Sequence, residues 1–267
     1  MKKEKHFKFG KNWKNFLSRL NNERIKVAEK SLKEKLKLNS LDGKSFLDIG
    51  CGSGLFSLAA RNLGANVLSF DYDKDSVACT EFLKNKYYPQ TENWRVTQAS
   101  VLDKSFMKSI GKFDVVYSWG VLHHTGDMLT ALANVDLNVR KDGLLFIAIY
   151  NDQSTKSKRW KSVKKLYCKN LLMKFLIKIS FIPYFIIIGF ASDLTNLKNP
   201  FSRYKNYKQN RGMSILHDWI DWLGGYPFEV AKPEKIFNFY YDRHYELVNL
   251  KTCGNSHGCN EYVLKKG

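Results

Sequence analysis

The sequence predicts an α/β fold in which the strands of a mostly parallel sheet alternate with helices. Between residues 45 and 150, five apolar stretches of strand length alternate with four helical stretches, the order expected of a parallel sheet covered on both faces. A glycine-rich turn follows the first strand, and a carboxylate ends the second. The carboxyl edge of the sheet therefore carries residues suited to binding a ligand.

The apolar pattern places each element in turn. One strand begins at Phe46 and runs into the glycine turn, and the other core strands are expected at 65–71, 93–99, 113–119 and 143–150. Helices are expected at 55–63, 75–86, 104–110 and 128–139. An aromatic segment at 7–13 precedes a helix that runs to about Leu38, and a helix at 234–243 precedes two last strands at 244–251 and 260–264.

The turn after the first strand indicates a site for a nucleoside cofactor. Gly50, Gly52 and Gly54 allow the backbone to approach a ligand closely, and the helix that starts near Leu55 directs unpaired N–H groups toward it. A dinucleotide fingerprint, G-x-G-x-x-G, would need a third glycine at Leu55 or Ser57. The nicotinamide alternative is therefore disfavoured.

Two carboxylates accompany the turn. Asp48 lies just ahead of it, and Asp71 ends the second strand about 20 residues later, the separation expected of an acid that accepts both ribose hydroxyls. Taken singly, Asp48 could cap the glycine turn and Asp71 could start a turn with Asp73. The combination of glycine triplet, spaced acid and further strands in order favours the cofactor site.

The pattern hydrophobic-hydrophobic-Asp-x-Gly-x-Gly-x-Gly resembles the first motif of class I S-adenosylmethionine (SAM) methyltransferases, and the resemblance extends over residues 45–150. It implies a Rossmann-like, seven-stranded, mostly parallel sheet with an antiparallel last strand and a helical insertion after strand five. It also implies SAM as cofactor and S-adenosylhomocysteine as product. The cofactor-binding residues that it indicates are Phe9, Trp13, Asp48, Gly50, Cys51, Gly52, Gly54, Asp71, Tyr72, Ser100, Val101 and Trp119.

We expect the chain to consist of four segments. We expect a helical lid at 1–40 in which Phe9 and Trp13 fold over SAM, although core packing of this helix is the competing interpretation. The SAM-binding core is expected at 41–151, a helical insertion that caps the acceptor at 152–232, and a helix with two strands that completes the core at 233–267. The insertion is far longer than an ordinary connection, which is typical of functional segments.

The first half of the insertion, 156–191, is basic and then strongly apolar. Lys174, Lys178 and Pro183 interrupt the apolar run, so we expect two helices and no membrane span. Contact with a membrane surface remains an alternative, but burial against the core or in a dimer is favoured over it.

The second half of the insertion carries a polar and aromatic cluster that we expect to bind the acceptor. His217 and Asp221 are four residues apart, so in a helix they share a face, and His217 could act as general base. The alternative is that this cluster only closes a loop. His123 and His124 are adjacent and point apart, so one of them is expected to be structural. The expected catalytic residues are His217, His124 and Asp221, and the expected substrate-binding residues are His123, Tyr150, Asn151, Asp218, Trp222, Tyr226 and Asn260.

Composition indicates the partner only broadly. The 44 basic and 25 acidic residues of the 267-residue chain give a net charge of +19, which attracts anions. Three of the five cysteines are widely scattered, and Cys253 and Cys259, which are six apart and near His257, would need further ligands to bind zinc. No secretory signal follows Met1, so we expect no metal and a cytoplasmic location. Oligomeric state cannot be read from the sequence.

The 217–227 cluster and the Gly-Cys-Asn-Glu ending at 258–261 resemble small-molecule O-methyltransferases of the ubiquinone-methylase and surface-polysaccharide-tailoring type. This resemblance, with the charge, implies O-methylation of a small anionic metabolite, such as a phosphorylated, phosphoramidate or nucleotide-linked precursor of a bacterial capsule. The alternatives are an RNA methyltransferase, with nucleic acid as a less favoured partner, and a quinone or lipid O-methyltransferase in peripheral contact with a membrane.

Overall fold

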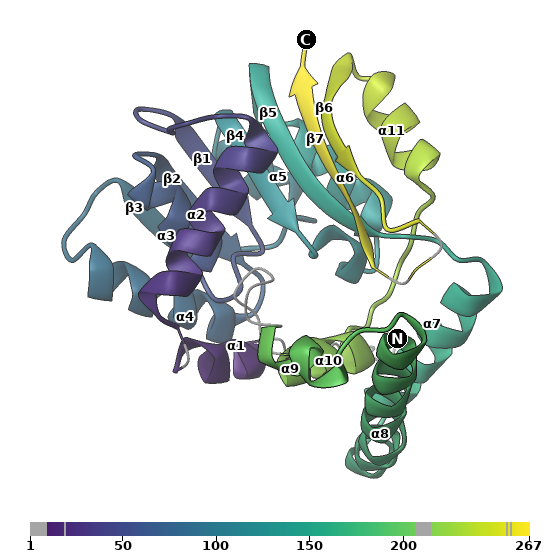
Figure 1. Ribbon diagram of the computed structural model, residues 1–267. Coiled ribbons are helices and arrows are strands. Elements are labelled where there is room, and N and C mark those ends of the chain that lie inside the picture. The colour runs from purple at the N-terminus through teal and green to yellow at the C-terminus, as the bar shows by residue number, and fades with distance from the viewer. Residues whose placement is uncertain (1–9, 19, 207–214, 255, 257) are drawn as a thin grey trace.

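The structure is a computed structural model that describes residues 10–18, 20–206, 215–254, 256 and 258–267. Its centre is a seven-stranded sheet (Figure 1). In spatial order the strands are β3 (Trp94–Gln98), β2 (Asn66–Asp71), β1 (Ser45–Ile49), β4 (Phe113–Trp119), β5 (Val139–Tyr150), β7 (Cys259–Lys266) and β6 (Tyr245–Lys251). The first five run parallel, and β7 is antiparallel to both β5 and β6, which confirms the predicted sheet.

Alternating side chains of the strands build two cores on opposite faces of the sheet. In β1, Phe46 belongs to one apolar cluster, whereas Leu47 and Ile49 belong to the other. The face of Phe46 is covered by α2 (Asn22–Leu36), α3 (Leu55–Asn62) and α4 (Lys74–Tyr87). The other face is covered by α5 (Lys104–Ser109), α6 (Met128–Asp136) and α11 (Pro233–Tyr241).

The remaining helices form a cap beyond the carboxyl ends of the parallel strands (Figure 1). They are α1 (Gly10–Leu17), α7 (Thr155–Tyr167), α8 (Leu171–Thr195), α9 (Pro200–Asn206) and α10 (Ile215–Gly224), and the short 3-10 helix η1 (Leu122–His124) follows β4. The cap thus consists of the start of the chain and the insertion after β5. This arrangement places the insertion where the glycine turn opens.

Some element boundaries differ from the prediction. The N-terminal region forms two helices rather than one, because α1 turns aside to contact α4, where the Gly10 N–H donates to Asp73 Oδ2 over 3.0 Å. Pro183 does not end a helix. It lies inside the 25-residue α8, and the break falls before Leu171 instead. Burial of the apolar run against the core is also wrong, since most of α8 is exposed.

Candidate active site

A cavity of about 1030 Å³ opens at the carboxyl ends of β1, β2, β3 and β4, beneath the cap. This volume is at the upper end for small-molecule sites and is enough for a nucleoside cofactor together with an acceptor. Both the core and the cap contribute to the wall. The predicted residues on the wall are Trp13, Asp48, Gly50, Cys51, Gly52, Asp71, Tyr72, Ser100, Val101, Trp119, His124, Tyr150, Asp218, Trp222 and Tyr226.

The glycine turn between β1 and α3 adopts a backbone that other residues rarely tolerate. Gly50 and Gly52 have φ angles of 73° and 55°. A Cβ atom at Gly50 would lie 2.4 Å from a methyl of Val121, and one at Gly52 would lie 3.0 Å from the indole nitrogen of Trp13. The turn therefore needs glycine for its conformation and because its neighbours approach so closely.

Gly54 lies behind the turn, away from the cavity wall, whereas we expected it at the cofactor. It is the N-cap of α3 but is not on the cavity wall, and a Cβ at this position would lie 2.8 Å from Thr80 Cα on α4. The third glycine therefore allows close packing of α3 against α4. It supports the turn from the side away from the cavity.

Asp71 and Asp48 lie beneath the turn in an environment that disfavours their charge. Asp71 accepts hydrogen bonds from the N–H groups of Gly52 at 3.0 Å and Asp73 at 2.8 Å, yet burial raises its pKa to about 6. Burial raises the pKa of Asp48 to about 7, the negative charge of Asp71 adds to this shift, and a 2.5 Å hydrogen bond from Ser57 Oγ opposes it. A ligand with hydroxyl or cationic groups would stabilise both carboxylates.

The loops after β3 and β4 complete the cofactor side of the cavity. Ser100 Oγ accepts the N–H of Leu102 at 3.2 Å, and the Val101 carbonyl accepts from Asn134 Nδ2 at 2.9 Å, so the loop that carries both residues is fixed. Trp119 Nε1 donates to Glu261 Oε1 at 3.4 Å. Tyr72 is exposed at the rim.

The structure describes only part of the predicted lid. Trp13 on α1 lies over Gly52 and lines the cavity, in agreement with the predicted position. Phe9 lies outside the described residues. The side chains of His217 and Asp221 also lie outside the described part of the chain, although both positions belong to α10 and are four residues apart there.

Aromatic rings from several segments form the cap side of the cavity. Tyr150 and Trp222 make an edge-to-face contact with centroids 5.2 Å apart, and Trp160 of α7 lies 5.4 Å from Trp222. Phe185 of α8 lies 5.6 Å from Trp219. Sequence reasoning missed Trp160 and Phe185, whereas Trp219 belongs to the cluster expected to bind the acceptor; all three line the cavity. The only signal for Trp160 was an isolated aromatic residue among lysines.

Among the side chains that the structure describes, His124 is the titratable group best placed to act as a base. Its Nδ1 lies 2.7 Å from the carbonyl oxygen of Pro227, and because a carbonyl only accepts, Nδ1 carries the hydrogen. The Nε2 of the neutral ring then bears a lone pair. Burial, together with the positive charge of Lys164, lowers the pKa of His124 to about 3, so the ring stays neutral at physiological pH.

His123 does not contact the cavity, which corrects its predicted substrate-binding role. The side chain is fully buried and stacks against the ring of Tyr150 with centroids 3.9 Å apart. Its Nδ1 accepts the N–H of Tyr150 at 3.3 Å. Of the two adjacent histidines, His123 is therefore the structural one, and it holds Tyr150 in the wall.

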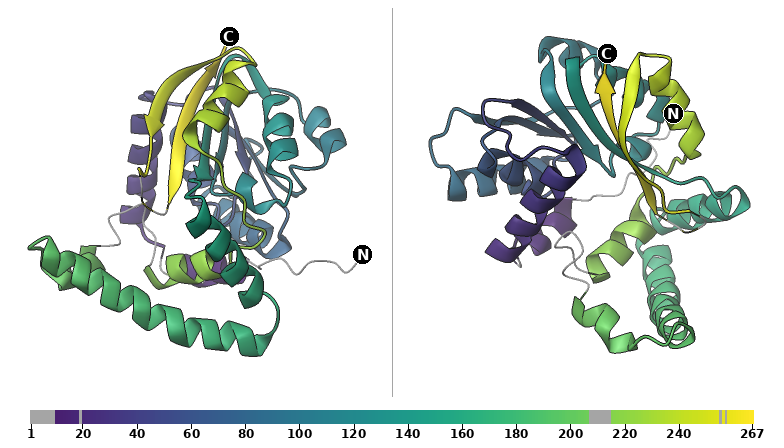
Figure 2. Two further views of the ribbon diagram at one scale, coloured as in Figure 1. Left: turned by 90° about the vertical axis from the view of Figure 1, so that its right-hand side faces the viewer. Right: turned by 45° about the horizontal axis from the view of Figure 1, so that its top comes forward.

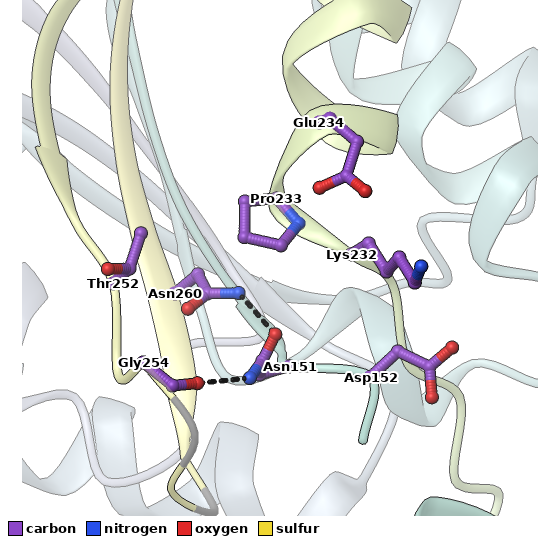
Figure 3. Close-up of a pocket in the computed structure, with 8 residues that line it drawn as sticks. All are labelled: Asn151, Asp152, Lys232, Pro233, Glu234, Thr252, Gly254 and Asn260. Atoms are coloured by element: carbon purple, nitrogen blue, oxygen red, sulfur yellow. Dashed lines mark hydrogen bonds between the residues drawn. The ribbon is translucent and has the colours of Figure 1, made fainter. Parts of the chain in front are cut away.

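Asn151 and Asn260 line a separate hollow of about 290 Å³ and are not on the wall of the large cavity, so their predicted role in binding the acceptor stays a prediction (Figure 3). Asn260 Nδ2 donates to Asn151 Oδ1 at 3.2 Å, and Asn151 Nδ2 donates to the carbonyl of Gly254 at 2.8 Å (Figure 3). These bonds tie the end of β5 to β7 and to the loop that precedes it. The two amides brace that loop.

No group of three or more histidine, cysteine or acidic residues that could hold a metal occurs among the residues that the structure describes. The groups on the cavity wall instead match an organic cation with a ribose. The turn supplies space and N–H groups, Asp71 is a buried acceptor, and Trp13 supplies an aromatic face. The residues present therefore fit SAM.

Comparisons with known proteins identify the family and agree with the fold. A family model described as a methyltransferase domain matches residues 20–176, more than half of the chain. The ubiquinone biosynthesis O-methyltransferase of Pelagibacter ubique is 28% identical over 132 residues, which cover 48% of this chain and 52% of that protein. The chain spans about half the length of the curated relatives it matches.

Solved structures show the same fold. Magnesium protoporphyrin IX methyltransferase from Synechocystis PCC 6803 with bound SAH matches with a TM-score of 0.55 at 13% identity, covering 96% of this chain and 94% of that one. The same enzyme with bound SAM matches with a TM-score of 0.53 at 10% identity, covering 91% and 79%. The chain belongs to the methyltransferase domain family and is a class I SAM-dependent methyltransferase.

Proposed function

We propose that the protein transfers the methyl group of SAM to a hydroxyl oxygen of an apolar, ring-containing acceptor of the quinol type. The observation that carries this proposal is the aromatic wall on the cap side of the cavity, where rings from β5, α7, α8 and α10 meet. Stacked and edge-to-face contacts favour a planar acceptor. The similarity to a ubiquinone biosynthesis O-methyltransferase supports the same class of acceptor.

The side chains have distinct functions in such a transfer. Bound SAM supplies a methyl group on a positively charged sulfur, and Asp71 with the glycine turn would hold its nucleoside. His124 Nε2 would accept the proton of the acceptor hydroxyl as the oxygen–carbon bond forms and the carbon–sulfur bond breaks. The aromatic wall would align the acceptor and exclude water, which is the main requirement of a displacement at an activated carbon.

The charges on the cavity wall give less support to the anionic capsule precursor expected from the composition. Of the described residues on the wall, only Lys251 is basic, whereas five are acidic: Asp48, Asp71, Asp73, Asp218 and Glu261. The net charge of +19 is therefore not concentrated at this site. O-methylation of a nucleotide-linked or phosphorylated precursor stays a prediction, as does RNA methylation.

Methyl transfer to supplied acceptors tests the proposal. The pure protein would be incubated with methyl-labelled SAM and, separately, a short-chain catechol or hydroquinol, nucleotide-linked sugars and total RNA. We expect label in the phenolic acceptor. Trp222→Ala should lower kcat/KM for it roughly tenfold or more through the lost ring contacts, with Trp222→Phe recovering part of the loss. Tyr241→Ala, at an exposed site on α11, is the matched control. Label only in nucleotide-linked sugars or RNA would contradict the proposal.

A further inference from the structure

Helix α8 presents an unusually apolar surface to solvent. Its exposed side chains include Leu172, Phe175, Leu176, Ile179, Ile187 and Leu194. Within the described ranges it is the one helix long and apolar enough to cross a membrane. In Figure 2 it runs along the underside of the molecule, away from the sheet. A soluble protein rarely leaves so much contiguous apolar surface uncovered without a partner.

The opposite side of α8 packs against the other cap helices α7 and α10, which argues against a membrane span. Phe181 and Phe185 contact Trp160 of α7, with ring centroids 5.4 and 6.1 Å apart, and Phe185 also contacts Trp219 of α10. Ile177 is buried in the same cluster. A spanning helix would need lipid or other membrane helices around it. A helix with one packed and one apolar exposed side suits the surface of a bilayer.

The positive charge around α8 indicates what kind of surface this helix would contact. Residues 153–192 contain nine basic residues and no aspartate or glutamate. On α7, next to α8, the side chains of Lys156, Lys158, Arg159, Lys161 and Lys165 are exposed. A second copy docked through the same face would bring two such basic segments together, which is unfavourable. Anionic lipid headgroups would complement the charge while the acyl region receives the apolar side chains.

We propose that α7 and α8 dock the protein on an anionic lipid bilayer, with α8 lying along the surface and its exposed side inserted. Trp160 of α7 and Phe185 of α8 also line the cavity, so the docked helices form part of the wall around the acceptor. An acceptor dissolved in the bilayer would then reach the cavity past these helices. The docking stands independently, whereas this route for the acceptor rests on the proposed function.

Sedimentation with lipid vesicles tests the docking. The full chain, without SAM or acceptor, would be mixed with vesicles of phosphatidylcholine alone or with about one third phosphatidylglycerol. We expect sedimentation with the anionic vesicles and its loss at high salt. Ile187→Glu should lower the partition coefficient about tenfold or more, because it removes an inserted apolar side chain and adds a negative charge. Leu129→Glu, at a comparably exposed apolar site on α6, should bind like the unmodified protein.

Several outcomes would overturn the docking: absence of sedimentation with the anionic vesicles, equal loss of sedimentation in both variants, or a stable dimer that Ile187→Glu dissociates. Membrane association in cells that resists carbonate extraction would show a spanning helix instead. Failure of the proposed function is distinguishable. Vesicle binding with no label in a phenolic acceptor would refute the acceptor class alone, and label in that acceptor without vesicle binding would refute the docking alone.

Discussion

The Nδ1 of His124 lies 2.7 Å from the carbonyl oxygen of Pro227, so a residue of the core and the segment after α10 are joined at the cavity wall. This contact fixes the tautomer of the imidazole. It also sets the direction in which Nε2 points, because the two nitrogens belong to one rigid ring. The last part of the insertion therefore orients the group that would act as base.

Replacement of His124 should stop turnover without affecting the cofactor. His124→Ala is expected to lower kcat roughly 100-fold or more, as loss of a general base does, while the Kd of SAM changes less than twofold. Since the pKa of His124 is lowered to about 3, the ring is neutral above that value and kcat at saturating SAM should be flat between pH 5 and 8. Retention of most of the activity, or an acid limb in kcat near pH 6.5, would contradict this function.

Lys164 holds the cap helices together beneath the aromatic wall. The side chain is fully buried, donates to the Trp222 carbonyl oxygen, and lies 4.0 Å and 4.7 Å from the ring centroids of Trp222 and Phe228. Lys164→Met should therefore lower the free energy of unfolding by about 2 kcal/mol and raise KM for the acceptor, with SAM affinity unchanged. Urea unfolding and steady-state kinetics measure both.

The matched control for Lys164 is Lys161→Met, at an exposed position of the same helix. It removes one positive charge without removing the contact with Trp222, so both the free energy of unfolding and KM should stay close to those of the unmodified protein. Equal effects of the two substitutions would show that charge, and not the buried contact, is responsible.

The sheet and the cofactor side of the cavity could be predicted because their signals are local. Gly50, Gly52 and Asp71 lie at fixed spacing around one strand–turn–helix unit, and a parallel sheet brings such turns to one edge. The alternation of Phe46 and Leu47 between two cores follows from the two-residue period of a strand. These relations require no knowledge of distant contacts.

The acceptor side depends on contacts between distant segments, which a single sequence does not reveal. Trp160 and Trp222 are 62 positions apart in the numbering, yet their ring centroids are 5.4 Å apart. Asn260 has the polarity of a binding residue, but its partner proves to be Asn151. Pro183 usually ends a helix, but α8 continues through it. Local propensity could not decide these positions.

Binding of SAM should weaken in acid because Asp71 must be ionised to accept ribose hydroxyls. Burial raises the pKa of Asp71 to about 6, so in the free protein the carboxylate is ionised above that pH and protonated below it. The contribution of Asp71 to the Kd should be nearly constant from pH 7 to 8 and should raise the Kd toward tenfold for each unit below about 6. Calorimetric titration at pH 5, 6 and 7.5 measures the slope.

Asp71→Asn supplies the comparison for this pH dependence. The amide does not titrate, so the variant should bind SAM weakly at every pH and lose the part of the slope that Asp71 contributes. Any slope that persists with a midpoint near 7 is assigned to Asp48, whose pKa is raised to about 7 by burial. Unchanged affinity in Asp71→Asn at pH 7.5 would refute the assignment of Asp71 to the ribose.

The glycine turn offers a test that separates backbone conformation from close contact. Gly50 and Gly111 have similar φ angles of 73° and 80°, but a Cβ at Gly50 would lie 2.4 Å from Val121, whereas nothing lies within 4 Å at Gly111. Gly111→Ala should therefore cost only about 1 kcal/mol of unfolding free energy and leave SAM binding intact. Gly50→Ala should cost more and weaken SAM binding at least tenfold, because the turn must shift.

Adding Val121→Ala makes room for the new methyl and should restore part of the affinity. If Gly50→Ala and Gly111→Ala bind SAM equally well, close contact at Val121 does not explain the glycine.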